Sequence, residues 1–353
     1  MRRSEVAISA IYAELAIRNM TIAKEVGIMK CAVRIIVITA VFILCMAHIS
    51  GAADFPERPV TLVNPQSPGG TNDILGRIWC AVAQKYLGQP VVITNKTGGG
   101  GWQGLVDVRE ARADGYTLLA DATGRITQEQ WLAVNKKPVP ATLKDFTLIG
   151  IMNMSPTLFI VNYDSPWKTL DDLIEACKAK PNQYAFSASA YGTTHFPILL
   201  LMDLAGIEAR PVFFVGGGPA HNALLGGHVH FSAQFPGSVI PFVQGKKERA
   251  LAVTAEKRWP SLPDVPTCKE RGYNVLWGQG IGIFAPKGTP SAIVKKLRDV
   301  HQKVVKDNKF IEMIENVGDF VYSMTPDEFN EYYENTSKTV NKLFAKEAAK
   351  PKK

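Results

Sequence analysis

The 353-residue chain has few cysteines and lacks several of the short motifs that mark common enzymes. Its five cysteines lack the close paired spacing of a zinc site, and they are too few for a disulfide scaffold. The patterns G-x-S-x-G, H-E-x-x-H, Walker A and Cys-x-x-Cys do not occur. The sequence also lacks a periodic repeat, a heptad run and a basic tract with aromatics, which argues against solenoids, coiled coils and nucleic-acid binding.

The N-terminal region has no apolar run long enough to anchor the chain in a membrane. The uncharged run at residues 35–47 is shorter than the roughly 20 residues that a spanning helix needs. A basic patch precedes this run, and the small residues at 50–53 follow it. These are the three parts of a secretory signal peptide, so we expect residues 1–53 to be cleaved after export.

Charge of either sign is also modest. The whole chain has a net charge of +8, and residues 1–53 contain six basic and three acidic residues, so the exported part keeps +5. Such a weak positive field favours small anions slightly. Three cysteines remain, Cys80, Cys177 and Cys268, and their apolar surroundings indicate buried, inert thiols.

After the signal region, β-rich runs alternate with segments of helical periodicity, which indicates an α/β protein. We expect strands at 60–63, 91–94, 116–120, 146–151, 157–161, 184–187, 211–215, 229–233, 250–254 and 281–285. We expect helices at 74–87, 102–112, 170–178, 196–205, 219–225, 291–305, 308–315 and 326–345. Short loops between alternating strands and helices predict parallel pairing with right-handed crossovers.

The first of four glycine-rich loops is residues 67–73, which contain Pro68-Gly69-Gly70 before a predicted helix. Tight backbone and the free amides of a helix start can hold a carboxylate or phosphate without an arginine. The alternative is an ordinary strand–helix turn in which Thr71 or Asn72 caps the helix.

The second loop, residues 187–195, places several hydroxyl groups and one imidazole at the start of a helix. That density exceeds what capping needs, so it favours contact with an anion or polar ligand. A capped turn remains the alternative, and His195 alone is more typical of a packed histidine.

The third loop contains Gly99-x-Gly101-x-x-Gly104, with Asp121 after the next strand, which is the layout of a dinucleotide-binding fingerprint. Residues 95–98 separate the strand from the motif, and bulky Trp102 occupies the place that pyrophosphate needs. Nicotinamide cofactors are also scarce outside the cytoplasm. We therefore expect no cofactor.

The fourth loop is Gly216-Gly217-Gly218-Pro219, a helix start that we expect to border a cleft. Further along, His228 and His230 alternate on one strand with His221 nearby. No acidic or thiol partner completes a metal site, so packing or surface roles are favoured.

Several stretches in order carry a resemblance to one family. They are Phe55-Pro56, Arg58-Pro59-Val60, Pro68-Gly69-Gly70, Asp73-Ile74-Leu75, Leu87-Gly88-Gln89-Pro90, Asp114-Gly115-Tyr116, Leu143-Lys144-Asp145-Phe146, Leu224-Leu225-Gly226-Gly227, Ala250-Leu251-Ala252-Val253-Thr254, Leu262-Pro263-Asp264-Val265-Pro266-Thr267 and Ala285-Pro286-Lys287-Gly288-Thr289-Pro290. From residue 55 to about residue 343, the chain resembles the Bug-type extracytoplasmic solute receptors of tripartite tricarboxylate transport systems.

The resemblance implies a type II periplasmic-binding-protein fold, with two α/β lobes, a hinge and a ligand cleft between them. Lobe 1 would be discontinuous, with residues 54–152 and 278–353, and lobe 2 would be residues 153–277. It further implies a periplasmic, monomeric binding protein that is not an enzyme, uses no cofactor or metal, and delivers a small carboxylate to a membrane permease.

By position, the resemblance also implies which residues contact the carboxylate. They are Ser67, Gly69, Gly70, Thr71, Ser189, Thr193, Thr194, His195 and Gln234. Gln234 stands where many members have Asp, which disfavours amino-bearing ligands, and Val215 stands where Lys is frequent. Because Phe213, Phe214 and Phe235 lie nearby in sequence, we expect a carboxylate with an apolar or aromatic body, although di- and tricarboxylates stay open.

Two other functions compete with transport. A sensory receptor would present its closed form to a membrane histidine kinase. A secreted enzyme would use the glycine loop at 98–104 for a dinucleotide.

Overall fold

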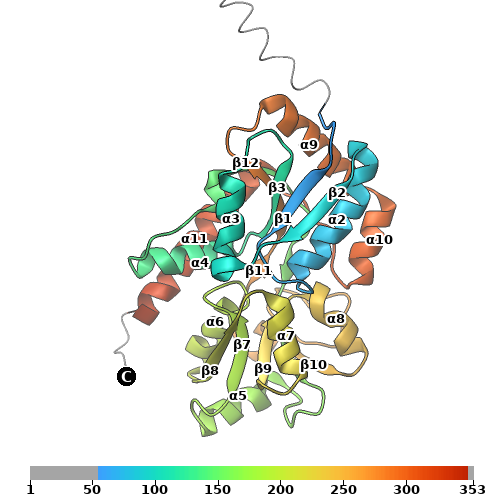
Figure 1. The fold of residues 1–353 in the computed structure, drawn as a ribbon. Coiled ribbons are helices and arrows are strands. Elements are labelled where there is room, and N and C mark those ends of the chain that lie inside the picture. The colour runs from blue at the N-terminus through green and yellow to red at the C-terminus, as the bar shows by residue number, and fades with distance from the viewer. Residues whose placement is uncertain (1–54, 349–353) are drawn as a thin grey trace, which may run out of the picture. The chain divides into compact units, whose positions relative to one another are not determined.

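The computed structural model describes residues 55–348, so the predicted signal region at residues 1–53 lies outside the described residues. The described chain forms two five-stranded sheets and one two-stranded sheet, with helices packed against the two large ones (Figure 1). We call each large sheet with its helices a lobe. Within residues 55–348, no helix combines the length and apolar character needed to cross a bilayer.

The sheet of lobe 1 is built from two distant parts of the chain. Its spatial order is β2 (Val91–Asn95), β1 (Val60–Asn64), β3 (Thr117–Ala122), β12 (Ile281–Pro286) and β4 (Phe146–Ile151). β1 is parallel to β2 and β3, whereas β12 runs antiparallel between β3 and β4. Because β12 follows all the strands of lobe 2 in the chain, lobe 1 is completed only after the chain has returned.

The sheet of lobe 2 has a similar mixed arrangement. Its spatial order is β10 (Glu248–Val253), β6 (Leu158–Asn162), β9 (Phe231–Gln234), β7 (Ala185–Ser189) and β8 (Arg210–Phe214). β7 is parallel to β8 and β9, and β6 is antiparallel to β9 and β10. This leaves β8 as an edge strand.

The helices divide between the lobes. Lobe 1 contains α2 (Thr71–Leu87), α3 (Trp102–Arg109), α4 (Arg125–Val134), α9 (Ser291–Val304), α10 (Asn308–Asn316) and α11 (Pro326–Ala348). Lobe 2 contains α5 (Leu170–Ala179), α6 (Phe196–Ala205), α7 (Gly217–Leu225) and α8 (Pro236–Gln244). Short 3-10 helices are η2 (Gly98–Gly101), η3 (Leu143–Asp145) and η4 (Lys269–Arg271).

Local sequence explains where several of these helices begin and end. α2 ends because Gly88 adopts a left-handed conformation, with φ of 73°, and its amide bonds to the Gln84 carbonyl oxygen. α5 begins with a capping box in which the Thr169 hydroxyl accepts from the Asp172 amide and the Asp172 carboxylate accepts from the Thr169 amide. Such a cap stabilises a helix by about 1 kcal/mol.

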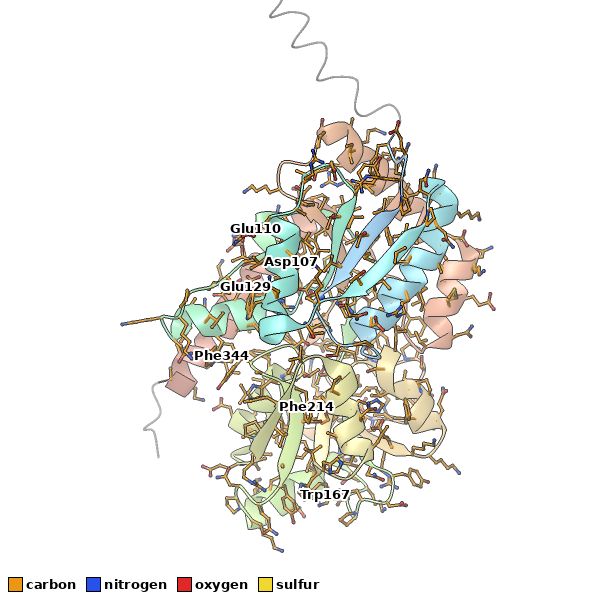
Figure 2. The ribbon with its side chains drawn as sticks, in the orientation of Figure 1. Asp107, Glu110, Glu129, Trp167, Phe214 and Phe344 are labelled. Carbon is orange, nitrogen blue, oxygen red and sulfur yellow. The ribbon has the colours of Figure 1, made fainter. Side chains whose placement is uncertain are left out.

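Each lobe has its own apolar core, and a third cluster connects them. Phe284 and Phe329 belong to the core of lobe 1, and Trp167 to that of lobe 2, where Figure 2 labels it. In the third cluster, Phe344 of α11 packs with Phe196 of α6. The C-terminal helix therefore contacts both lobes.

The chain crosses between the lobes through a small sheet. β5 (Ser155–Pro156) pairs antiparallel with β11 (Gly278–Gln279). Beside it, buried Asp319 accepts hydrogen bonds from the side chains of Asn153 and Ser155. Burial raises the pKa of Asp319 to about 6, although these hydrogen bonds oppose the shift.

The structure corrects the sequence analysis in three respects. Two helices, α4 and α8, were not predicted. Parallel pairing is confirmed for β1 with β2 and β3, and for β7 with β8 and β9, but β6, β10 and β12 pair antiparallel. β9 begins at Phe231 and not at residue 229, since the His230 ring accepts from the Ala185 amide before the strand starts.

Cys80, Cys177 and Cys268 are buried and free, as the sequence indicated. Burial raises the pKa of Cys80 and Cys268 to about 12 and that of Cys177 to about 11. A thiol with so high a pKa stays protonated, so these side chains have little nucleophilic character.

Candidate functional site

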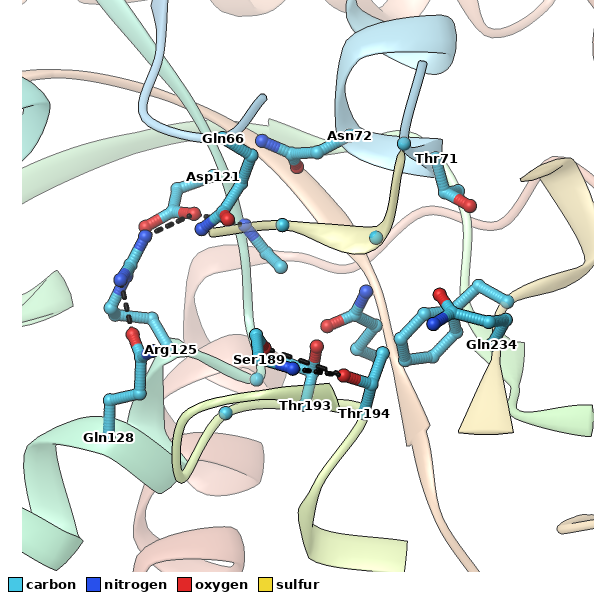
Figure 3. Close-up of a pocket in the computed structure, with 18 residues that line it drawn as sticks. Gln66, Thr71, Asn72, Asp121, Arg125, Gln128, Ser189, Thr193, Thr194 and Gln234 are labelled. Atoms are coloured by element: carbon cyan, nitrogen blue, oxygen red, sulfur yellow. Dashed lines mark hydrogen bonds and ion pairs between the residues drawn. The ribbon is translucent and has the colours of Figure 1, made fainter. Parts of the chain in front are cut away.

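A pocket lies where the two lobes meet, and loops of both lobes line it (Figure 3). Lobe 1 contributes the starts of α2 and α4 and the end of β3. Lobe 2 contributes the loop after β7, the start of α7 and the end of β9. The space between the lining atoms is about 530 Å³, with its opening to solvent included.

The start of α2 presents unpaired polar groups to this pocket. Gly70 is the N-cap, and the amides of Thr71 and Asn72 have no acceptor among residues 55–348. The Thr71 Oγ1 and Asn72 Oδ1 atoms are also buried without a partner in the described chain. Unpaired donors at a helix N-terminus attract an anion, because the helix dipole adds a partial positive charge there.

The one acid in this first turn is already paired. Asp73 accepts hydrogen bonds from Arg77, from Asn95 and from the Gly69 amide. Burial raises the pKa of Asp73, but these bonds outweigh it and lower the pKa below its ordinary value. The Arg77 guanidinium offsets the negative charge, so the carboxylate does not repel an anion at the helix start.

The loop after β7 holds its shape through its own side chains. The Thr194 hydroxyl accepts from the Ser189 amide at 2.9 Å, and His195 Nδ1 accepts from the Tyr191 amide at 3.2 Å. Burial lowers the pKa of His195 to about 3, so the ring is neutral. His195 therefore stabilises the loop through its bond to Tyr191, does not line the pocket, and brings no positive charge to it.

The start of α7 touches the first glycine loop main chain to main chain. A Cβ atom placed on Gly218 would lie 2.3 Å from the Pro68 carbonyl oxygen. One placed on Gly70 would lie 3.2 Å from the Gly218 amide nitrogen. Since real Cβ contacts do not fall below 3.0 Å, the lobes approach this closely only because both loops lack side chains.

An ion pair lines the pocket: Figure 3 shows Asp121, which lies at the end of β3, beside Arg125, which begins α4. Arg125 Nε lies 2.7 Å from Asp121 Oδ2, and both side chains are 1% exposed. Arg125 also donates to Gln128, and Gln128 Nε2 donates across the cleft to the Ala190 carbonyl oxygen at 3.1 Å. The two formal charges cancel, so they add no net charge to the site.

The structure brings together most of the predicted ligand residues. Gly70, Thr71, Ser189, Thr193, Thr194 and Gln234 line the pocket. Ser67 and Gly69 belong to the same loop but do not line the pocket, and His195 lies behind the second loop. The role of all nine residues in binding stays a prediction.

Sequence reasoning missed part of the lining. Gln66, Asn72, Asp121, Arg125, Gln128 and Gln279 were not predicted as ligand residues. Asp121 was noticed only as the acid of a dinucleotide fingerprint, and its hydrogen bonds to Arg125 give it another role. The fourth glycine loop does border the cleft, as expected, through Gly216 and Gly217.

Two of the three histidines noted in the sequence, His221 and His230, have partners inside lobe 2. His230 contacts Tyr184 and Trp167, and His221 Nε2 lies 2.8 Å from Glu248 Oε1 inside lobe 2. Within residues 55–348, no three His, Cys, Asp or Glu side chains are placed to hold a metal ion. Packing roles account for both histidines.

Comparison with known proteins decides the family. A family model described as "Tripartite tricarboxylate transporter family receptor" matches residues 76–348. The chain belongs to this family. The resemblance seen in the sequence is thus confirmed, and the receptor is one of a family of solute-binding proteins.

Individual relatives are similar to this chain over more than four fifths of its length. It is 30% identical to the protein BugT of Bordetella pertussis, over 84% of this chain and 91% of BugT. Among solved structures, MatC of Rhodopseudomonas palustris with bound malate is 27% identical, with a TM-score of 0.75 over 82% of this chain and 100% of MatC. Rpa4515 of R. palustris with adipate is 29% identical, with a TM-score of 0.75 over 82% of this chain and 98% of that protein. The predicted two-lobed binding-protein fold is confirmed.

Proposed function

We propose that the receptor works in the periplasm, captures a small carboxylate between its lobes, and delivers it to a membrane permease of the tripartite tricarboxylate type. The family assignment supports a receptor of this transport class. The boundaries of lobe 1 at residues 54–152 and 278–353 are part of the same proposal, with lobe 2 at residues 153–277.

One observation carries the choice of a carboxylate. The helices α2, α4 and α7 begin with residues that line the pocket, and α8 begins directly after the lining residue Phe235. Each helix start has a partial positive charge, worth typically 0.3–1 kcal/mol toward a nearby anion and about 2 kcal/mol in buried geometries. Because Asp73 and Asp121 are paired with arginines, no lone acid opposes this field among the lining residues.

We further propose which groups contact the carboxylate. The amides and hydroxyls of Gly70 and Thr71 would face those of Ser189, Thr193 and Thr194 across the pocket. Ser67, Gly69 and His195 would position these two loops, and neutral Gln234 would contact the ligand without attracting an amino group.

The bound ligands of two relatives fit this chemistry. MatC of R. palustris was solved with malate, and Rpa4515 of the same organism was solved with adipate. Both ligands are small carboxylates, so the same ligand class is proposed for this receptor.

Isothermal titration calorimetry on residues 54–353 tests the proposal. We would titrate hexanoate, adipate and malate, and use hexanamide as the neutral counterpart of hexanoate. Saturable binding of at least one acid, with the amide bound at least tenfold more weakly and the acid recovered unchanged, supports the proposal. Equal binding of hexanoate and hexanamide, or binding of no carboxylate, contradicts it.

Delivery to a permease needs its own experiment. Cells that lack this receptor should lose uptake of the radiolabelled acid identified by calorimetry, and the gene supplied in trans should restore it. Unchanged uptake would contradict the transport role, while leaving carboxylate binding in place.

A further inference from the structure

A second pocket opens beside the first, and nothing in the family assignment explains it. Its volume is about 440 Å³, with its opening included. Gln66, Gln128, Ser189 and Gly216 line both pockets. The two pockets are therefore direct neighbours that share these four residues.

The walls of the second pocket are apolar beyond the shared residues. Phe213 and Phe214, at the end of the edge strand β8, line it together with Val215, and Ala190 lies beside this strand end, directly after the partner of Phe214 on β7. Figure 2 labels Phe214 in the half of lobe 2 that faces lobe 1. None of the residues that line this pocket carries a charge.

The aromatic wall is held in place before any ligand arrives. The Phe213 ring contacts the rings of Tyr191 and His195, with centroid distances of 5.5 and 5.1 Å. Tyr191 in turn stacks on Trp131 of lobe 1 at 3.7 Å. Despite these contacts Phe213 is 40% exposed, so apolar surface remains for a ligand to cover. A preorganised wall lowers the entropy cost of binding.

We infer that the second pocket receives the apolar body of the ligand, and that the receptor selects monocarboxylates with an aliphatic or aryl body over short dicarboxylates. This inference rests on the proposed function, since the carboxylate must first occupy the neighbouring pocket. A second carboxylate directed toward Phe213 and Val215 would lose its hydration without gaining a cation, and the nearby Arg125 is already paired with Asp121.

Calorimetry with matched acids tests the selectivity. Hexanoate and adipate have the same chain of six carbons and differ only in whether the far end is a methyl or a carboxylate. We expect hexanoate and 3-phenylpropanoate to bind at least about tenfold more tightly than adipate, because the far carboxylate of adipate would lose its hydration without a partner, whereas an apolar end gains free energy from burial.

Two variants locate the effect in the second pocket. Phe213→Ala should weaken binding of hexanoate and 3-phenylpropanoate about tenfold and change adipate binding less than about threefold. The matched control is Val212→Ala, since Val212 precedes Phe213 on the same edge strand, is similarly exposed at 37% and does not line the pocket. Val215→Lys places a cation there and should reverse the preference toward adipate.

The outcomes separate this inference from the proposed function. If wild type binds none of the acids, the proposed function fails. If it binds adipate as tightly as hexanoate, or if Phe213→Ala weakens all acids alike, the inference fails and the proposed function stands. Thermal unfolding of each variant checks the fold, and an unchanged preference in folded Val215→Lys would also overturn the inference.

Discussion

Replacement of Gly218 by alanine should block closure of the lobes without harming the fold. Gly218 is the second residue of α7, and its backbone is helical, so alanine meets no strain within the helix itself. In a helix, alanine is favoured over glycine by about 0.5–1 kcal/mol. Lobe 2 should therefore be at least as stable in the variant as in wild type.

The alanine side chain destabilises only the arrangement in which the two glycine loops touch. The added Cβ would lie 2.3 Å from the Pro68 carbonyl oxygen and 3.2 Å from the Gly70 amide nitrogen, and both neighbours are main-chain atoms. The loops must separate until the first contact exceeds 3.0 Å. Overpacking of this kind costs about 1–3 kcal/mol, which corresponds to about 5- to 150-fold in the population of the closed form. Carboxylate affinity should fall by the same factor if only the closed form grips the ligand.

Calorimetry and small-angle X-ray scattering would measure the effect. Wild type should become more compact at saturating carboxylate, whereas Gly218→Ala should stay expanded and bind weakly. Asn222→Ala is the matched control, since Asn222 lies on the same helix, is exposed and does not line the pocket, and its affinity should stay within about threefold of wild type. Wild-type affinity in Gly218→Ala would refute the argument that bare main chain is required at this contact.

Three further outcomes are expected. Gly70→Val should abolish carboxylate binding in calorimetry with an unchanged circular dichroism spectrum, because even its Cβ would lie within 3.3 Å of two amide nitrogens. Thr193→Ala should weaken binding by about 1–3 kcal/mol while Thr193→Ser does not, if the hydroxyl meets the carboxylate. Burial raises the pKa of Glu129 to about 7, so the protonated carboxyl stabilises the folded state fully below pH 4.5, and this stabilisation is lost as pH rises through 7. Urea unfolding of wild type should therefore show the free energy of unfolding fall by about 3 kcal/mol over this range, and the fall should be smaller in Glu129→Gln.

Much of the fold could be predicted because its signals are local. The periodicity of α2, the left-handed glycine that ends it and the β-rich runs beside it are all readable over a few residues. The insertion of β12 between β3 and β4 has no such signal, since it depends on contacts between residues far apart in the chain. The resemblance to the receptor family predicted the two-lobed fold, which the local patterns did not.

The two missed helices show where local reasoning fails. α8 contains Pro241 inside it, and an internal proline normally breaks or kinks a helix. α4 has no side-chain cap and no acid in its first turn, so its start resembles a loop. α4 packs against α11, and this tertiary contact stabilises a helix whose own sequence has no capping signal.

The omission of α4 explains why two of the lining residues were missed. Arg125 and Gln128 both lie on α4, so a sequence analysis without this helix could not place them at the site. Gln279 belongs to β11, and it reaches the pocket only because the chain crosses back between the lobes there.

The arrangement of charges suits a receptor that must release what it captures. A lone arginine in the pocket would bind an anion strongly in the open form as well, and closure would then add little. Here Arg125 is paired with Asp121, so the proposed attraction comes from helix starts in both lobes, which line one pocket in the arrangement where the glycine loops touch. A ligand that contacts both sets at once favours the closed form by the difference in its affinity for the two states. Under the proposed function, a permease that separates the lobes would withdraw one set of amides from the carboxylate and so weaken its binding.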